Sequence, residues 1–137
     1  MAVVAEAVPE LRDRAVDEVR DDRAGGIATF TGTTRAQSRG REVVRLEYEA
    51  YEGMAEAVMA EIADGLRTRH DLVAVAIHHR VGVVSIGETS VVIAVSAAHR
   101  HEALAACREA IDELKVRVPL WKKEVYDGGE EWIGRGS

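Results

Sequence analysis

The chain has 137 residues, 47% hydrophobic and 31% charged, which is the balance of a globular protein with a sizeable core, and we expect one domain over 1–137. With 18 Lys plus Arg against 24 Asp plus Glu, the net charge of −6 argues against a general nucleic-acid-binding protein. No apolar run approaches the roughly 20 residues of a membrane helix, and the N-terminus has no secretory signal pattern, so we expect a cytoplasmic protein without membrane attachment.

Two basic segments interrupt this acidic composition. Residues 115–123 contain four Lys or Arg side chains and no acidic one, and residues 35–45 contain four arginines and one glutamate. Cationic islands on an acidic protein suit a small anionic ligand. The chain has a single cysteine, Cys107, which excludes an internal disulfide and a multi-cysteine zinc cluster.

The first half of the chain predicts a helix, two strands and a second helix. Apolar residues recur at helical spacing over 9–20, and β-branched residues over 27–33 indicate a strand. The polar segment 34–42 is expected to be a flexible loop. Apolar and charged residues alternate over 44–50, with Val44, Leu46, Tyr48 and Ala50 on the apolar face of a half-exposed strand. Residues 54–69 are rich in helix-forming side chains.

The second half predicts strands followed by a long helix. Residues 73–80 read as a strand, and 89–97 is apolar enough for a central one, with a glycine-broken apolar stretch between them. A helix is expected over 99–118, ended by Pro119. Its apolar stripe comprises Leu104, Cys107, Ile111, Leu114 and Val118.

The segment after this helix indicates a β-hairpin. Residues 121–126 and 130–133 flank Asp127-Gly128-Gly129, a composition typical of tight hairpin turns. Because the strands are paired without strict βα alternation, the order of elements predicts an α+β fold.

Cys107 is the first candidate for chemistry, because a thiolate is a nucleophile. It lies on the apolar stripe of the predicted helix, where a buried cysteine usually behaves as a small hydrophobic residue. We therefore interpret it as structural.

Cationic side chains give further candidates near strand ends. His99 and Arg100 stand between the strand 89–97 and the following helix, so they form either an anion-binding corner at a helix N-terminus or a solvated cap. Arg35 follows the strand 27–33 and either reaches a site or lies in solvent. Its segment lacks the Gly-Lys-Ser/Thr ending of a P-loop.

Lys115 borders the apolar stripe near the end of the predicted helix, and Lys122 follows after Pro119 and Trp121. A lysine beside apolar surface and other cations can have a pKa low enough for nucleophilic or acid–base work. Cations are also common at helix C-termini, where they offset the helix dipole. The spacing alone leaves both interpretations open.

Two other arrangements do not indicate a catalytic site. His78 and His79 are adjacent in a predicted strand, so they point to opposite faces and cannot chelate one ion together. Neither belongs to a His-Glu-x-x-His motif, and Ser90 and Ser96 lack a nucleophile-elbow context. We expect no metal site.

Taken together, several segments resemble the catalytic (large) subunit family of molybdopterin synthase, the MoaE family. The most specific is His-Arg at 99–100 followed by Lys-x-x-x-Pro-x-Trp-Lys-x-Glu at 115–124. The matching segments, in the family's order, are Gly26–Arg35, Leu46–Tyr51, His79–Gly82, Gly87-Glu88, Val95–Arg100, Ile111–Lys115 and Val118–Glu124.

The resemblance implies an α+β subunit of the α/β-hammerhead type, with an antiparallel sheet and a C-terminal β-hairpin, that forms a homodimer. Each subunit would bind a small ubiquitin-like sulfur-carrier subunit, giving a heterotetramer. The carrier's C-terminal Gly-Gly thiocarboxylate would enter a pocket that also takes cyclic pyranopterin monophosphate. Two sulfur transfers would then form the dithiolene of molybdopterin, without a metal or organic cofactor.

The motif also implies roles for individual residues. Lys115 would be the main catalytic lysine, and Lys122 would neutralise the thiocarboxylate or the leaving oxygen. The residues expected to hold the phosphate and the pterin are Arg35, His99 and Arg100. Glu124 would orient Lys122 or the hairpin. The resemblance further implies that residues such as Arg35 from a dimer mate can complete one subunit's pocket.

One segment departs from the family pattern, because 36–42 has two arginines where asparagine is frequent. Three other functions are compatible with the residues. They are a non-catalytic α+β domain that binds a small molecule and dimerises through its sheet, a scaffold that keeps the carrier interface without chemistry, and an unrelated lysine enzyme that forms a Schiff base with a carbonyl substrate.

Overall fold

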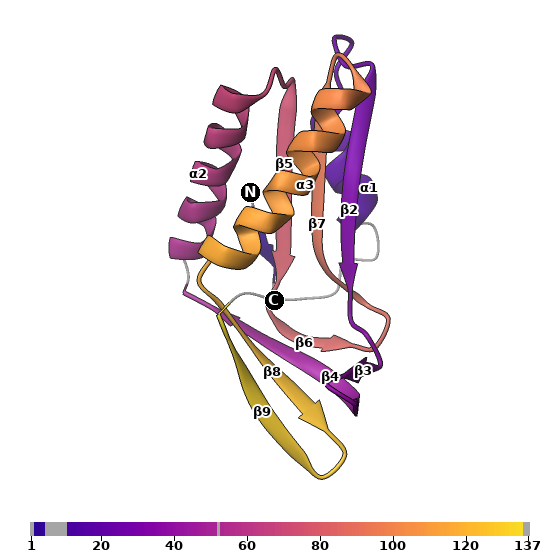
Figure 1. Cartoon of the computed structure of the whole chain (residues 1–137), viewed down its shortest axis with the longest axis vertical. Helices are drawn as coiled ribbons and strands as arrows, with labels where there is room; N and C mark the ends of the chain where they lie inside the picture. Colours follow the sequence, from indigo (N-terminus) through magenta and orange to yellow (C-terminus); the bar gives the residue numbers. More distant parts are fainter. Residues whose placement is uncertain (1, 5–10, 52, 136–137) are drawn as a thin grey trace.

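The computed structural model describes residues 2–4, 11–51 and 53–135, which form two β-sheets and three helices (Figure 1). The helices are α1 (Leu11–Val19), α2 (Met54–Arg69) and α3 (Arg100–Arg117). The first sheet has the strand order β1 (Ala2–Val4), β5 (Ala74–Arg80), β7 (Thr89–Ala97), β2 (Gly26–Thr33). The second has the order β3 (Gln37–Ser38), β4 (Arg41–Ala50), β8 (Leu120–Tyr126), β9 (Gly129–Arg135), and β6 (Gly82–Ser85) also pairs with β4.

The first sheet is covered on both faces, which explains why its central strands are almost wholly apolar. Ile77 and Ile93 belong to the core that α2 and α3 complete, whereas Ala76 and Ala94 pack against α1 on the other face (Figure 1). Successive side chains of a strand point to opposite faces, so both sets must be apolar. The strands predicted over 27–33, 73–80 and 89–97 are confirmed.

The pairing within the sheets is mostly antiparallel. β5 pairs antiparallel with β7, and β7 with β2, while β1 pairs parallel with β5. The α+β prediction and the C-terminal hairpin are confirmed, since β8 and β9 pair around Asp127 and Gly128. The helix over 54–69 is confirmed, and α1 agrees with the helix predicted over 9–20, whose first two residues lie outside the described part. No helix within the described ranges is long and apolar enough to cross a membrane.

α3 has the predicted bounds within two residues, but the predicted stripe is wrong at one position. Cys107, Ile111, Leu114 and Val118 are buried, whereas Leu104 is 61% exposed. The helix contacts the sheet instead through small residues one position away. These are Ala103, Ala106 and Ala110, all buried. Alanines let the helix approach the sheet closely, and this orientation turns Leu104 outward.

The segment 34–42 contains a short hairpin, so the prediction of a flexible loop is wrong. β3 pairs with Arg41 and Glu42 at the start of β4. The turn residues Arg39 and Gly40 both have positive φ, of 55° and 76°. Two-residue hairpin turns of type I′ require positive φ at both positions. The polar composition concealed this hairpin because its flanking residues have no apolar alternation.

β4 contains a β-bulge that changes which valine is buried. Val43 pairs with Tyr126 and Arg45 with Val125, which leaves Val44 as an extra residue. Val44 is consequently 48% exposed and Val43 only 6%. The predicted alternation is therefore wrong at Val44 and confirmed at Leu46 and Tyr48, which are buried.

The start of β2 lies directly against the start of α3. The backbone N–H of Gly25 donates to the carbonyl of Ala97 at 3.0 Å. A Cβ atom added to Gly25 would clash with the carbonyl oxygen of Ala98, and one on Gly26 would lie 3.3 Å from the Cα of Arg100. Side chains are excluded here because two backbones meet.

Candidate active site

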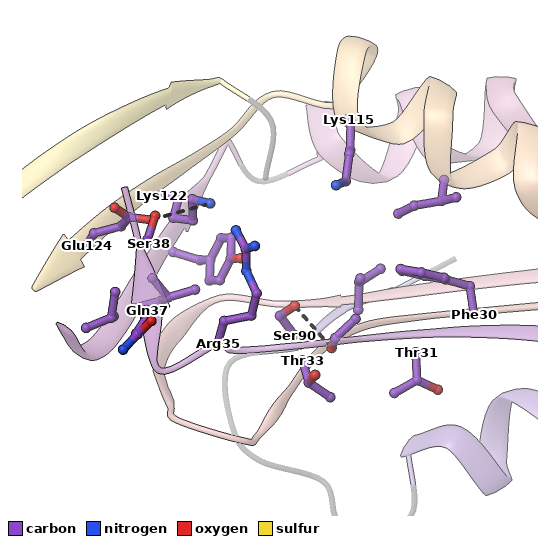
Figure 2. Close-up of a pocket in the computed structure, with 16 residues that line it drawn as sticks. Phe30, Thr31, Thr33, Arg35, Gln37, Ser38, Ser90, Lys115, Lys122 and Glu124 are labelled. Carbon is purple, nitrogen blue, oxygen red and sulfur yellow. Dashed lines mark hydrogen bonds and ion pairs between the residues drawn. The ribbon is translucent and has the colours of Figure 1, made fainter. Parts of the chain in front are cut away.

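A cavity of about 450 Å³ lies where the two sheets meet beneath the C-terminal end of α3 (Figure 2). Its walls come from β2, β7, α3, β3, β4 and β8 and from the loop after β2. This volume is in the range of small-molecule sites. The residues that line it are Phe30, Thr31, Gly32, Thr33, Arg35, Gln37, Ser38, Val43, Leu46, Tyr48, Ser90, Val91, Ile111, Lys115, Lys122 and Glu124.

Three cations and one carboxylate define the charge of this cavity. Arg35, Lys115 and Lys122 approach from three different elements, and Figure 2 shows their side chains converging on one space. Glu124 is the single acidic residue in the lining. A cavity with this excess of positive charge suits an anionic ligand on a protein whose net charge is −6.

The position of Arg35 is set by the residue before it. Thr34 is 3% exposed, and its backbone exchanges two hydrogen bonds with the turn before β7. The N–H of Thr34 donates to Glu88 O at 3.0 Å, and the N–H of Gly87 donates to Thr34 O at 2.9 Å. This anchor fixes where the chain leaves β2, so the exposed Arg35 side chain begins from a defined point at the cavity rim.

Lys115 projects from the last turn of α3. Leu114 beside it is fully buried, and the helix ends where the N–H of Val118 donates to Leu114 O at 3.1 Å. Pro119 follows and cannot continue the helix, so the chain turns into β8. This short connection brings Lys115 and Lys122 to one cavity.

Lys122, Glu124 and Tyr126 share one face of β8, because alternate residues of a strand point the same way. Trp121 and Lys123 occupy the other face. Burial lowers the pKa of Lys122, and the charges of Lys115, Arg35 and Arg39 lower it further, against the opposing effect of Glu124. A larger fraction of this amine is therefore neutral at a given pH than in an ordinary lysine.

Glu124 is 4% exposed and has three polar partners. Tyr126 donates a hydrogen bond to its Oε1, and the Lys122 Nζ lies 4.0 Å from its Oε2. The Ser38 hydroxyl interacts with the same carboxylate and lowers its pKa. Burial raises the pKa of Glu124, but the bonds from Tyr126 and Ser38 and the charge of Lys122 outweigh this and hold the pKa below its usual value. The carboxylate is thus ionised and oriented at neutral pH.

Several hydroxyl groups at the cavity were not predicted from the sequence. Tyr48, which is the register partner of Lys122, is buried, and its pKa is raised by burial in spite of a hydrogen bond with Ser90. The Ser90 hydroxyl also donates to Gly32 O at 3.3 Å. The meeting of the two sheets brings these groups together, and no sequence spacing indicated it. The position of Tyr126 could have been predicted, because it is two residues beyond Glu124 in a predicted strand and so lies on the same face.

His99 and Arg100 are not part of the cavity of their own chain. They are exposed at the first residues of α3, roughly 22 Å along the helix axis from Lys115 at 1.5 Å per residue. The structure thus brings together Arg35, Lys115, Lys122 and Glu124, and separates the histidine–arginine pair from them. The ligand contacts of all six residues stay a prediction.

The remaining candidates are buried within the fold. Cys107 is 6% exposed, and burial raises the pKa of its thiol to about 11, as expected for a structural cysteine. His78 and His79 lie on opposite faces of β5, where His78 pairs with Glu18 at 2.9 Å and His79 contacts the ring of Tyr48. Among the residues that the structure describes, no three His, Cys, Asp or Glu side chains gather as a metal site would require.

Comparison with known proteins identifies the family. The sequence matches the family described as MoaE protein over residues 5–117. The chain belongs to the MoaE family. Among the relatives of this MoaE chain, the molybdopterin synthase catalytic subunit of Oryza sativa subsp. indica is 56% identical over 119 residues, which is 87% of this chain and 62% of that one. The chain therefore spans about three fifths of the length of this plant relative.

Solved structures agree with this membership. The crystal structure of molybdopterin synthase from Staphylococcus aureus superposes with a TM-score of 0.92 at 34% identity, covering 97% of this MoaE chain and 96% of that chain. The fold that the resemblance implied is therefore found in a family member. A complex of subunits 1 and 2 of molybdopterin-converting factor from Helicobacter pylori shares the fold, with a TM-score of 0.79 at 19% identity and coverage of 96% and 88%.

Proposed function

We propose that this chain is the catalytic subunit of a molybdopterin synthase. It would transfer sulfur from the C-terminal thiocarboxylate of a small ubiquitin-like carrier subunit to cyclic pyranopterin monophosphate, in the cytoplasm. The observation that carries the proposal is the cationic cavity in which Lys115 and Lys122 face one another across the space that Arg35 borders. Relatives named molybdopterin synthase catalytic subunit, at up to 56% identity, support it.

The charge of the cavity fits both proposed reactants. The precursor carries a cyclic phosphate and the carrier tail an anionic thiocarboxylate, so both need cations in a site that excludes bulk water. Arg35 can bind a phosphate with two parallel hydrogen bonds, which a lysine cannot do. Hydroxyls of Ser38, Tyr48 and Ser90 add neutral hydrogen-bonding groups for the pterin.

The two lysines would have different tasks. Lys122 is partly buried and its pKa is lowered, so it can neutralise the thiocarboxylate or donate a proton to the oxygen that leaves the precursor. Lys115 is exposed to the cavity at the end of α3 and would activate or hold the precursor. Each transfer replaces a carbon–oxygen bond of the precursor by a carbon–sulfur bond, with the oxygen leaving as the protonated group. Water then cleaves the acyl–sulfur bond and leaves the carrier with a carboxylate. Two such cycles yield the dithiolene.

A homodimer would reconcile the distant His99 and Arg100 with a role at the site. Among the described strands β2 pairs only with β7, so its outer side is a sheet edge, and Ile27 and Phe30 on this strand are each 37% exposed. If two copies pair these edges about a two-fold axis, the Gly26 end of one strand lies beside the Thr33 end of the other. Because Gly26 contacts Arg100, the partner's histidine–arginine pair would then reach the Arg35 side of the cavity.

The proposal is tested by reconstitution with a thiocarboxylated carrier and cyclic pyranopterin monophosphate. Product is measured as the fluorescent oxidised derivative of molybdopterin, with Lys115→Ala in parallel. Product from the wild type and far less from the variant is the expected result. Equal amounts of product from both would remove the lysine assignment. A wild type that binds the carrier and makes no product would contradict the catalytic function and favour a scaffold.

A further inference from the structure

Tyr126 is the buried group at this site to which neither the motif nor the proposed reaction gives a role. It lies at the end of β8, is 8% exposed, and its hydroxyl donates to Glu124 Oε1. Arg41 belongs to the hairpin that β3 and β4 form, and its guanidinium lies 5.0 Å from the centre of the Tyr126 ring. Tyr126 is thus clamped between a cation and a carboxylate.

The two oxygens of Glu124 have different partners. Oε1 is held by Tyr126, whereas Oε2 is the oxygen that faces the Lys122 ammonium at 4.0 Å. The carboxylate of a glutamate can rotate about its Cγ–Cδ bond unless one oxygen is fixed. At 4.0 Å the ion pair with Lys122 is too long to fix it alone. A hydrogen bond to a charged acceptor is stronger than one between two neutral groups, so the bond from Tyr126 can hold this oxygen.

We propose that Tyr126 is a positioning residue of this site, which fixes one oxygen of Glu124 so that the other stays directed at Lys122. A role in catalysis rests on the proposed function, whereas the contacts between Tyr126, Glu124 and Lys122 are independent of it. The hydrogen bond to Glu124 and burial raise the pKa of Tyr126, so the phenol stays protonated and keeps donating at neutral pH. Ser38 of β3, a strand that pairs with β4, adds a second hydrogen-bonding interaction that lowers the pKa of Glu124.

Other charges act on this pair from the surrounding elements. The groups that influence Lys122 besides Glu124 are Lys115 from α3, Arg35 from the loop after β2 and Arg39 from the turn before β4. Burial favours the neutral amine most, and these three cations favour it further. Glu124 is the group that opposes them, so its orientation contributes to how much of Lys122 is protonated. Loss of the Tyr126 bond would let the carboxylate turn away and leave Lys122 more often neutral.

The test measures Lys122 directly in the whole protein by competitive acylation of lysines, read by fragment-ion mass spectrometry at fixed pH near neutrality. Only neutral amines react, and Lys123 on the opposite face of β8 is the internal reference. In Tyr126→Phe the ratio of Lys122 to Lys123 labelling is expected to rise roughly threefold, because a neighbouring negative charge is less well placed. Glu124→Gln is expected to raise it at least as much, and the double variant no further than Glu124→Gln alone.

Controls separate positioning from general loosening. Tyr51→Phe removes a phenol from the residue after β4, where the side chain is 60% exposed, and should leave the ratio unchanged. Ser38→Ala removes the weaker partner of Glu124 and should raise the ratio of Lys122 to Lys123 labelling less than Tyr126→Phe does. An unchanged ratio in Tyr126→Phe beside a raised one in Glu124→Gln would overturn the proposal, as would an equal rise in Tyr51→Phe. In the sulfur-transfer assay Tyr126→Phe should lower kcat more than it changes KM. A wild type without activity would count against the proposed function and leave the labelling result decisive for Tyr126.

Discussion

Lys115 on α3 and Lys122 on β8 face one cavity, and the charge of Lys115 contributes to the lowered pKa of Lys122. Two ammonium groups in one small space repel each other, so an anionic ligand is attracted to them. The connection that creates this arrangement is only a few residues long. Pro119 ends the helix, and β8 begins at the next residue.

Replacement of Lys115 by alanine should reduce sulfur transfer by more than about 100-fold, because a residue that acts only in the transition state contributes several kcal/mol. Lys115→Arg should recover binding of the precursor but not the rate, if the amine itself reacts. The measurement is kcat and KM in the reconstituted assay. Lys123→Ala is the matched control, because Lys123 points away from the cavity and pairs with Glu47 and Glu130. An equal loss in the control would contradict the assignment.

Mixing two impaired variants tests whether the site is shared between subunits. Arg100→Ala and Lys115→Ala should each be weakly active alone. Re-assembled together, half of the dimers are mixed and each mixed dimer holds one intact site, so about a quarter of the wild-type sites should return. Activity after co-expression, with mass spectrometry to prove that mixed dimers form, is the measurement. Mixed dimers without recovered activity would show that Arg100 does not act across the interface.

The buried His79 predicts a loss of stability in weak acid. Burial lowers its pKa from 6.5 to about 4, so between these values the unfolded chain binds a proton that the folded protein does not. Stability therefore falls as pH drops from 6.5 towards 4, by about 3 kcal/mol for this group. Denaturant unfolding at several pH values gives the free energy of unfolding as a function of pH. This free energy should fall less steeply with decreasing pH in His79→Asn than in the wild type. The asparagine amide can keep the donor that bonds Arg80 O at 2.7 Å. The same slope in both proteins would exclude His79 as its source.

Cys107 should prove dispensable for sulfur transfer. Its pKa of about 11 against an ordinary 9.0 lowers the thiolate fraction at neutral pH about 100-fold, in addition to the protection of burial. Alkylation of the native protein should accordingly be slow and become fast on unfolding. Cys107→Ala should keep full activity and lose roughly 1–2 kcal/mol of stability through the small cavity it creates. A large loss of activity in a folded Cys107→Ala protein would return the thiol to the candidates.

Patterns within one element were the part of the fold that could be predicted from the sequence. The helix over 54–69 was predicted from its helix-forming side chains, and the strand over 89–97 from its nearly continuous run of apolar and β-branched residues. Errors arose where a partner decides the outcome. Val44 is exposed because β8 skips it in the pairing, and Leu104 is exposed because alanines one position away contact the sheet.

The cavity likewise contains residues that the sequence predicted and residues whose positions depend on other strands. Arg35, Lys115, Lys122 and Glu124 were predicted from a motif, and the structure places all four in one lining. Ser38 and Tyr48 were not predicted, because their places depend on how β3 and β8 pair with β4 and in which register. Arg100 was grouped with these residues by the motif, although its own chain holds it at the other end of α3.

The backbone contact between Gly25 and Ala98 gives this architecture an unusual genetic property. A side chain at Gly25 would push the carbonyl of Ala98 and with it His99, one residue further on. In a dimer with shared sites, that displacement would harm the neighbour's pocket and spare the pocket of the altered chain. Gly25→Ala would then act in trans. In a cell that carries one normal and one altered copy, mixed dimers would have the damaged pocket on the normal chain.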